Sequence, residues 1–368
     1  MRRSALRLDR DDASVRLDPG RLGLSTRSEE VALAHRAHSG KSATSFPIDV
    51  VYTWVDGRDR AWRRNLEVAL ATESLDRNTL RRGASESRFH NRGELRYSLR
   101  SLDMYARFVR RIFIVTADQT PSWLDLGNPR IRVVSHCEIF PRSEHLPTFN
   151  SHAIECHLHR IPGLSEHFLY LNDDVMFSHW VTPADFFGAR GNPIVYLDSR
   201  RVAWRGWDPR YRHPAQCAAR NNSRFLEARY GARITRRIDH VPYALRRSDL
   251  AHLWELMPEA LDRTSGHRFR HPDDLSLVSS LAQFYGVALG RNRVVERSES
   301  TYIKVKRGVF NRILMHWKLA KCRYLRWPSK KFLSVNDAGT FDGSLRTERA
   351  LRAFFENQGP LPSAFEKR

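Results

Sequence analysis

The hydrophobic and polar positions follow two different periods along the chain, and these periods predict its main elements. Short runs of β-branched and aromatic residues bounded by Pro, Gly, Asn or Asp are typical of strands. Such runs occur at 48–55, 110–118, 131–136, 168–177 and 193–198. Apolar residues spaced three and four apart are typical of helices. This spacing, together with composition, predicts helices at 61–72, 91–105, 149–161, 244–262, 273–286, 309–325 and 354–358. Because strands alternate with helices, we expect βαβ units and an α/β fold with a mostly parallel sheet and flanking helices.

The same pattern suggests how the 368 residues are organised. Residues 1–45 are polar and rich in Arg, Ser and Asp, so we expect a flexible basic arm. Residues 46–345 form the predicted core, in which 74–90 is expected to be a loop. The Arg- and aromatic-rich range 199–239 is weakly patterned and is expected to be an inserted helical or irregular lobe. Residues 346–368 are expected to form a helical tail that packs on the core.

One predicted helix is both basic and amphipathic. It covers about 309–325, and Phe310, Leu314 and Trp317 share one of its faces. We expect this face to pack on the core. The alternative is peripheral contact with a membrane surface.

Composition narrows the classes of protein to consider. The net charge is +21 and the pI is about 10.5, so the surface attracts polyanions such as anionic lipids or phosphorylated sugars. No nucleic-acid-binding motif accompanies this charge, so we expect no specific nucleic-acid partner. The sequence has no apolar run of about 18 residues and no apolar secretory signal near its start. The four cysteines are widely spaced and predict reduced thiols. We therefore expect a cytoplasmic protein, with peripheral contact at the inner face of the cell membrane as an option.

Acidic residues follow three of the predicted strands. Asp56 and Asp118 each end a strand, and Asp173 and Asp174 interrupt the apolar run FLYLNDDVMF. Turn formation alone accounts for such residues in many proteins. The ends of parallel strands also converge on one edge of a sheet, where α/β proteins bind ligands. Two adjacent carboxylates there suit Mg²⁺ or Mn²⁺ held together with substrate phosphates.

Two further segments concentrate polar chemistry. His152, Glu155 and His159 have the same spacing as His267, His271 and Asp274, and a zinc site is an alternative for either set. The second set lies in RFRHPDD at 268–274, whose arginines are suited to gripping phosphate. A surface salt-bridge cluster is the simpler explanation for that segment. The chain contains no P-loop, no GxGxxG and no GxSxG motif.

Four blocks together resemble the Stealth family of polysaccharide phosphotransferases. They are IDVVYTWVDGRD at 48–59, NRGELRYSLRSL through FLYLNDDVMF at 91–177, DHVPYALRR through HRFRHPDD at 239–274, and FLSVNDAG at 332–339. The resemblance implies a Rossmann-like, glycosyltransferase-type core. It also implies transfer of a hexose 1-phosphate from a nucleotide sugar to a glycan hydroxyl.

The resemblance also implies roles for individual residues. It places His240, Asp174, Arg270 and Glu155 among the catalytic residues, with Asp173 and Asp174 holding Mg²⁺ or Mn²⁺. Contacts to the nucleotide-sugar donor are implied for Tyr52, Trp54, Asp56, Gly57, Arg96 and Asn336. Asp337 matches the fourth family block beside Asn336. Arg96 is either a donor contact or a structural clamp, and Glu155 orients either His240 or the metal. Many relatives carry a second histidine where this chain has Pro242 and Tyr243, so no catalytic role is expected there.

The implied reaction has UDP-N-acetylglucosamine as donor, a capsular or cell-wall glycan as acceptor and UMP as leaving group. Two alternatives stay open at this point. A metal-dependent glycosyltransferase would use a similar donor site but release UDP. A basic polyanion-binding protein would need no acidic strand ends.

Overall fold

A five-stranded sheet forms the centre of the described chain. The computed structural model describes residues 46–74, 77–202, 213–306, 308–324, 330–337 and 344–367, so the predicted arm at 1–45 lies outside the described residues. The sheet has the order β3-β2-β1-β4-β8. Its strands are β1 (Ile48–Thr53), β2 (Ile112–Thr116), β3 (Ile131–Ser135), β4 (His167–Asn172) and β8 (Tyr243–Arg246). The first four run parallel and β8 pairs antiparallel with β4. The predicted α/β fold with a mostly parallel sheet is confirmed.

The central strands are apolar along nearly their whole length. Every residue of β2, and the first five of β1, are buried. This is the pattern of parallel strands that are covered on both faces, and it explains why their sequence shows no alternation.

Two smaller sheets adjoin the central one. The first has the order β10-β11-β5, with β10 (Ser300–Val305), β11 (Phe332–Asp337) and β5 (Val175–Phe177). The second has the order β7-β6-β9, with β7 (Arg236–Ile238), β6 (Ile194–Arg201) and β9 (Arg293–Val295). The run 168–177 was expected to be one strand, and this is wrong. β4 belongs to the central sheet and β5 pairs antiparallel with β11, so Asp173 and Asp174 form the turn between two sheets.

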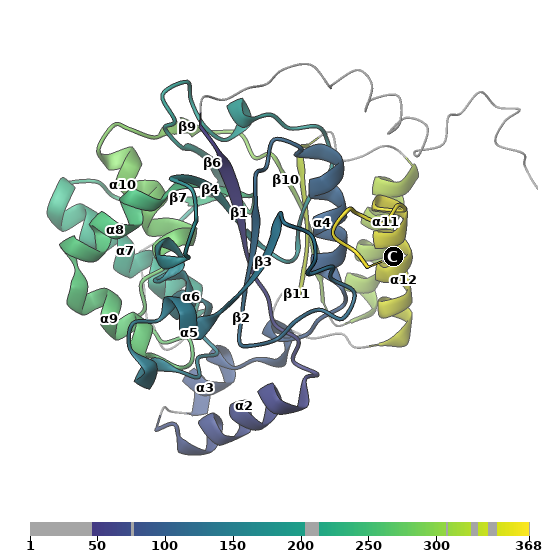
Figure 1. Ribbon diagram of the computed structural model, residues 1–368, viewed down its shortest axis with the longest axis horizontal. Coiled ribbons are helices and arrows are strands. Elements are labelled where there is room, and N and C mark those ends of the chain that lie inside the picture. Colours follow the sequence, from purple (N-terminus) through teal and green to yellow (C-terminus); the bar gives the residue numbers. More distant parts are fainter. Residues whose placement is uncertain are drawn as a thin grey trace, which may run out of the picture. The chain divides into compact units, whose positions relative to one another are not determined.

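Helices lie on both sides of the central strands (Figure 1). In that view α4 (Glu94–Tyr105), α11 (Val309–Tyr324) and α12 (Leu345–Gln358) lie on one side. The other side carries α7 (Pro214–Tyr230), α8 (Arg247–Leu256), α9 (Pro258–Gly266) and α10 (Ala282–Ala288). The remaining helices are α2 (Arg60–Thr72), α3 (Arg77–Gly83), α5 (His136–Ile139) and α6 (Ser151–Glu155).

Several sequence-based boundaries need correction. The expected loop at 74–90 contains α3. In the range 199–239, which was expected to be helical or irregular, the 17-residue helix α7 forms. Helix α7 begins after a capping His213 with Pro214 in its first turn, and it ends at Gly231 in the left-handed conformation. The expected helix at 244–262 begins as strand β8, because pairing with β4 outweighs local periodicity. The helix expected at 149–161 is reduced to α6 and a short 3₁₀ turn.

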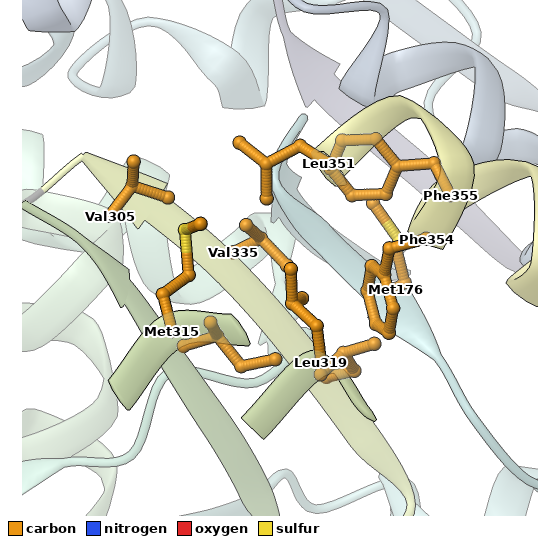
Figure 2. Packing of buried hydrophobic residues seen from close by; sticks show 10 residues of the cluster. Met176, Val305, Met315, Leu319, Val335, Leu351, Phe354 and Phe355 are labelled. Carbon is orange, nitrogen blue, oxygen red and sulfur yellow. The ribbon is translucent and has the colours of Figure 1, made fainter. Parts of the chain in front are cut away.

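The basic helix α11 forms where it was expected, but its orientation differs from the prediction. Met315 and Leu319 are its buried apolar residues, whereas Phe310, Leu314 and Trp317 are exposed. The buried pair packs into a cluster with strands β10 and β11 and helix α12 (Figure 2). No helix in the described ranges has both the length and the apolar character needed to cross a membrane.

Candidate active site

A cavity of about 450 Å³ opens at the carboxyl ends of the parallel strands. Trp54 follows β1, Ala117 follows β2, His136 follows β3 and Asp173 follows β4, and all four line the cavity. Strand order reverses between β1 and β4, because β2 and β3 lie on one side of β1 and β4 on the other. Such a switch point is the usual ligand site of an open α/β sheet.

Asp174 is held in place by three side chains from distant parts of the chain. Its Oδ2 atom accepts hydrogen bonds from Nδ2 of Asn336 at 2.7 Å and from Oγ of Ser334 at 3.2 Å. Its Oδ1 atom lies 3.3 Å from Nε2 of His240. A carboxylate offers about four lone-pair positions, so Asp174 retains about one for a further ligand on Oδ1.

His240 is positioned by the loop that carries it. Its backbone N–H donates to Asp239, whose other carboxylate oxygen accepts the backbone N–H groups of Glu299 and Ser300. The ring of Tyr302 lies edge-on to the imidazole at 5.6 Å. With Nε2 directed at Asp174, Nδ1 is the nitrogen left to accept a proton from another group.

The two partners shift each other's pKa in opposite directions. Burial acts to raise the pKa of Asp174, but His240, Asn336 and Ser334 outweigh it, so the pKa lies below its ordinary value. Burial acts to lower the pKa of His240, but the charge and hydrogen bond of Asp174 outweigh it and the pKa is raised. The geometry therefore favours an imidazolium–carboxylate pair.

Asp173 brings a second acidic group to this end of the cavity. Burial raises its pKa well above the ordinary value, and the charges of Glu94 and Asp174 raise it further. Burial also raises the pKa of Glu94 to about 7, although backbone hydrogen bonds and Arg92 oppose this, and the charge of Asp174 adds to it. All three carboxylates line the cavity. A cation between them would relieve their repulsion.

Two arginines line the cavity as well. Arg88 and Arg270 each adjoin a buried phenylalanine, Phe89 and Phe269, in an aromatic cluster with Trp62. Packing fixes Phe89 and Phe269 in place. It therefore holds the adjacent backbone at Arg88 and Arg270 where both arginine side chains line the cavity. Burial is the main cause that lowers the pKa of both guanidinium groups, and Arg270 lowers that of Arg88 further.

The hydrogen-bond partners of these arginines are neutral. Nη2 of Arg88 lies 2.9 Å from Nε2 of His213, and Nη2 of Arg270 donates to Oγ of Ser151 at 2.5 Å. Burial and nearby arginines lower the pKa of His213 to about 3, which keeps its imidazole neutral. Within the described ranges neither Arg88 nor Arg270 forms a salt bridge. Two guanidinium groups that share a cavity and whose hydrogen-bond partners are neutral are suited to bind an anion.

Glu155 lines the cavity, but among the described residues it forms no hydrogen bond with His240. Its Oε1 accepts from Oγ of Ser279 at 3.0 Å and from the hydroxyl of Tyr170 at 3.4 Å. The carboxylate also acts electrostatically on Arg270, raising that residue's pKa against the effect of burial. Asp174, and not Glu155, is therefore the acid that orients His240.

The two histidine-containing segments meet at Asp274. Its carboxylate is fully buried and lies 3.0 Å from Nδ1 of His152 and 2.7 Å from Nδ1 of His267. Asn150 donates to the same carboxylate and to the carbonyl groups of His267 and Phe269. This network ties the loop of Arg270 to helix α6. Across the described residues, no group of three or more His, Cys, Asp or Glu side chains is arranged to hold a metal ion by itself, so the zinc alternative gains no support.

The expected donor-binding residues of the first block separate into two groups. Trp54 lines the cavity, whereas Tyr52 is fully buried and its hydroxyl bonds to Oγ of Ser98 at 2.8 Å. Asp56 turns back to accept from the backbone N–H of Arg58. Gly57 permits close packing, because a Cβ atom there would lie 2.5 Å from the carbonyl oxygen of Phe89. Tyr52, Asp56 and Gly57 thus support the site from outside the cavity lining.

Arg96 lies away from the cavity and acts as a clamp. Its guanidinium group and that of Arg100 both bind the carboxylate of Glu366 near the end of the described chain. The side chain of Glu366 is 1% exposed. Of the two roles expected for Arg96, the structural one fits this geometry. Asp118, the third strand-end acid, is exposed and bonds to Ser135, so it does not join the site.

A hard divalent cation fits the acidic end of the cavity. Asp173 and Asp174 are adjacent and both line the cavity, as does Asn336, whose amide nitrogen donates to Asp174. Mg²⁺ is commonly bound by one or two carboxylates together with water and substrate phosphates. The donor set therefore suits Mg²⁺ or Mn²⁺ in the presence of a phosphorylated substrate.

Several cavity residues were not selected from the sequence. They include Arg88, Glu94, His136 and His213. Arg88 is not marked by a motif, since Arg-Phe pairs also occur at 107–108, 224–225 and 268–269. The others are single polar residues in segments without a distinctive pattern.

Comparison with known proteins identifies three conserved regions in the chain. Stealth protein conserved region 1 matches residues 46–71, conserved region 2 matches 88–195 and conserved region 3 matches 239–286. Asp173, Asp174, Glu155, His240 and Arg270 all fall within these regions.

Curated relatives carry the same similarity over most of the chain. An exopolysaccharide phosphotransferase of Streptomyces coelicolor is 41% identical over 328 residues, covering 88% of this chain and 52% of that protein. The exopolysaccharide phosphotransferase CpsY of Mycobacterium leprae is 35% identical over 329 residues, covering 89% of this chain and 58% of that protein. The chain thus spans about half the length of the curated relatives it matches.

Solved structures align at low identity. Mouse xyloside xylosyltransferase 1 in its apo form aligns with a TM-score of 0.39 at 10% identity, over 80% of this chain and 99% of that one. The galactosyltransferase LgtC, in complex with donor and acceptor sugar analogues, aligns with a TM-score of 0.41 at 11% identity, over 85% of this chain and 96% of that one.

The conserved regions and the relatives agree, and the three regions contain most of the residues that line the cavity. The chain belongs to the Stealth protein family.

Proposed function

We propose that this chain transfers a hexose 1-phosphate from a nucleotide diphosphate sugar to a hydroxyl group of an exopolysaccharide. The donor that we propose is UDP-N-acetylglucosamine, and the product is a phosphodiester in a capsular or cell-wall glycan with UMP as leaving group. The relatives named above are exopolysaccharide phosphotransferases, which supports the reaction class.

The observation that carries the proposal is the division of charge in one cavity. Arg88 and Arg270 form a cationic end, and Asp173 and Asp174 form an anionic end. A nucleotide diphosphate bound with a divalent cation presents the complementary charges. A protein that only bound polyanions would gain no affinity from acidic side chains in its binding cavity.

Each end has a role in binding the donor. Arg88 and Arg270 would bind the diphosphate oxygens, since a guanidinium group matches phosphate geometry. Trp54 also lines the cavity and offers an aromatic surface to the base. Asp173 and Asp174 would hold Mg²⁺ or Mn²⁺, which neutralises charge on the diphosphate when bound.

The transfer step needs one proton acceptor near the acceptor hydroxyl. That hydroxyl oxygen attacks the phosphorus that carries the sugar and forms a new P–O bond. The bond from this phosphorus to the bridging oxygen breaks, and UMP leaves with the electron pair. Nδ1 of His240 takes the hydroxyl proton, while Asp174 stabilises the resulting imidazolium. Arg270 takes the charge that develops on the transferred phosphoryl group.

Identification of the nucleotide product tests this proposal. With a UDP-sugar and a glycan acceptor, we expect chromatography to show UMP and phosphorus NMR to show a new phosphodiester in the glycan. Attack at the anomeric carbon would instead release both phosphates with the nucleoside. UDP as the sole product, with an ordinary glycosidic linkage, would establish the glycosyltransferase alternative. A panel of UDP-, GDP- and CMP-sugars under the same assay tests the choice of donor.

A further inference from the structure

Helix α11 exposes its largest apolar side chains. Met315 and Leu319 face the cluster shared with α12 (Figure 2). On the opposite side of the helix, four side chains are exposed by 76%, 62%, 42% and 56%, and they are Phe310, Ile313, Leu314 and Trp317 in that order. We call these four residues the α11 patch. Their spacing of three and four places them on one stripe.

The α11 patch is unusual within this molecule. Ten large hydrophobic side chains are exposed among the described residues, and four of them belong to this one helix face. Single exposed apolar residues are normal on a protein surface, but a contiguous group is typical of an interaction site.

The chain segment that carries the patch has charged residues of one sign only. Residues 300–336 contain ten Lys or Arg residues and no Asp or Glu. Nζ of Lys321 lies 4.9 Å from the ring of Trp317, at the edge of the patch. Lys304, on the adjoining strand β10, is exposed. Its pKa is lowered by burial and by nearby cations, which include Lys306 and Lys318.

We propose that α11 lies in the plane of an anionic lipid surface, with the α11 patch inserted among the headgroups and the surrounding cations paired with lipid phosphates. An amphipathic helix that combines Trp, Phe and Leu on one face with Lys and Arg beside it binds such interfaces. The long Lys and Arg side chains extend from the apolar surface to the phosphate layer.

Charge also decides between a lipid surface and a second copy of the chain. A symmetric dimer through the α11 patch would bring two identical cationic regions together, and like charges oppose such contact. An anionic bilayer offers the opposite charge and an apolar interior, and so matches both features of the surface.

Vesicle co-sedimentation tests the proposal. Wild-type protein should sediment with vesicles that contain equal parts of phosphatidylcholine and phosphatidylglycerol, and should not sediment with phosphatidylcholine alone. Raising the salt concentration should weaken this binding, because its electrostatic part is screened. The double variant F310S/W317S should lose about tenfold or more in affinity, since binding scales with buried apolar area.

The matched control is L126S/L361S. Leu126 and Leu361 are exposed by 57% and 50% but lie outside the basic region, so this double variant should bind like wild type. Circular dichroism and nucleotide-sugar affinity verify that both double variants keep their fold.

Three results would overturn the proposal. They are unchanged vesicle binding by F310S/W317S, equal binding to neutral and anionic vesicles, and no vesicle binding by wild type. If sedimentation shows a wild-type dimer that only F310S/W317S dissociates, the patch serves a second copy of the chain and the lipid assignment is wrong.

Discussion

The Nε2 atom of His240 lies 3.3 Å from the Oδ1 atom of Asp174, although 66 positions separate the two residues in the chain. Each raises the charged fraction of the other, since the pKa of His240 is raised and that of Asp174 is lowered. This pairing makes the proton-accepting capacity of His240 depend on the carboxylate that is also proposed to hold a metal ion.

Asp174→Asn tests the double role of this carboxylate. We expect the variant to fold and to lose turnover by about 10²–10³-fold, the usual cost of one preorganised electrostatic contact. The pKa of His240, followed by NMR of its ring protons, should fall toward or below its ordinary value because the neighbouring charge is gone. The control is Asp273→Asn, which alters an exposed acid outside the cavity lining. Full activity of Asp174→Asn at low Mg²⁺ would show that Asp174 is not needed for the metal.

His240→Ala should lower turnover by roughly 10²–10⁴-fold, the range for a lost general base, while donor affinity changes much less. Loss of donor binding with an unchanged turnover number at saturation would assign His240 to binding alone.

The pH dependence of activity follows from the raised pKa of His240. Its base form is neutral, so turnover in wild type should rise with pH through a midpoint above 6.5, the ordinary histidine value. The stability that the His240–Asp174 pair adds to the folded state has the opposite pH dependence. It is fully present below 6.5 and is lost as the pH rises through the folded-state pKa of His240. Thermal unfolding of wild type and His240→Ala across this range should therefore converge at the pH where wild-type activity is highest.

Arg270→Lys should reduce turnover by about 10²-fold, even though the charge is kept. A lysine cannot reproduce the planar fork that matches a phosphoryl group. The matched control is Arg268→Lys, two positions away and outside the cavity lining. Steady-state kinetics on both variants measures the difference. Similar turnover in the two variants would remove Arg270 from the transfer step.

Glu366→Ala should destabilise the fold by about 3–5 kcal/mol, because Arg100 would remain buried without its partner. Denaturant unfolding measures this loss. Arg96→Ala should lower stability by less and leave donor affinity unchanged, as expected of a clamp. A weaker donor affinity in Arg96→Ala would restore the donor-contact role.

Acid should weaken the contact of Glu366 with Arg96 and Arg100 progressively between pH 4.5 and about 2. Burial acts to raise the pKa of Glu366, but hydrogen bonds from Arg100, the backbone of Ser363 and Arg96 lower it to about 2. The stability it adds is present above its ordinary value of 4.5 and is lost as the pH falls through about 2.

The sequence by itself determined the elements whose signal is local. The apolar runs of β1 and β2 and the three-four spacing of α4 predicted these elements because a buried strand or helix must show its period. Local composition also marked Asp173 and Asp174, since two carboxylates within an apolar run must meet solvent or a partner.

Tertiary structure decided which of these residues face one another. Strand β8 was predicted as helix because its pairing with β4 is a long-range contact that leaves no local pattern. Arg88 enters the cavity because Phe89 packs with residues far along the chain, and Tyr52 is excluded because its strand side chain points into the core. The face of α11 that looked suited to the core is exposed, because helical periodicity groups residues on a face but does not say what covers it.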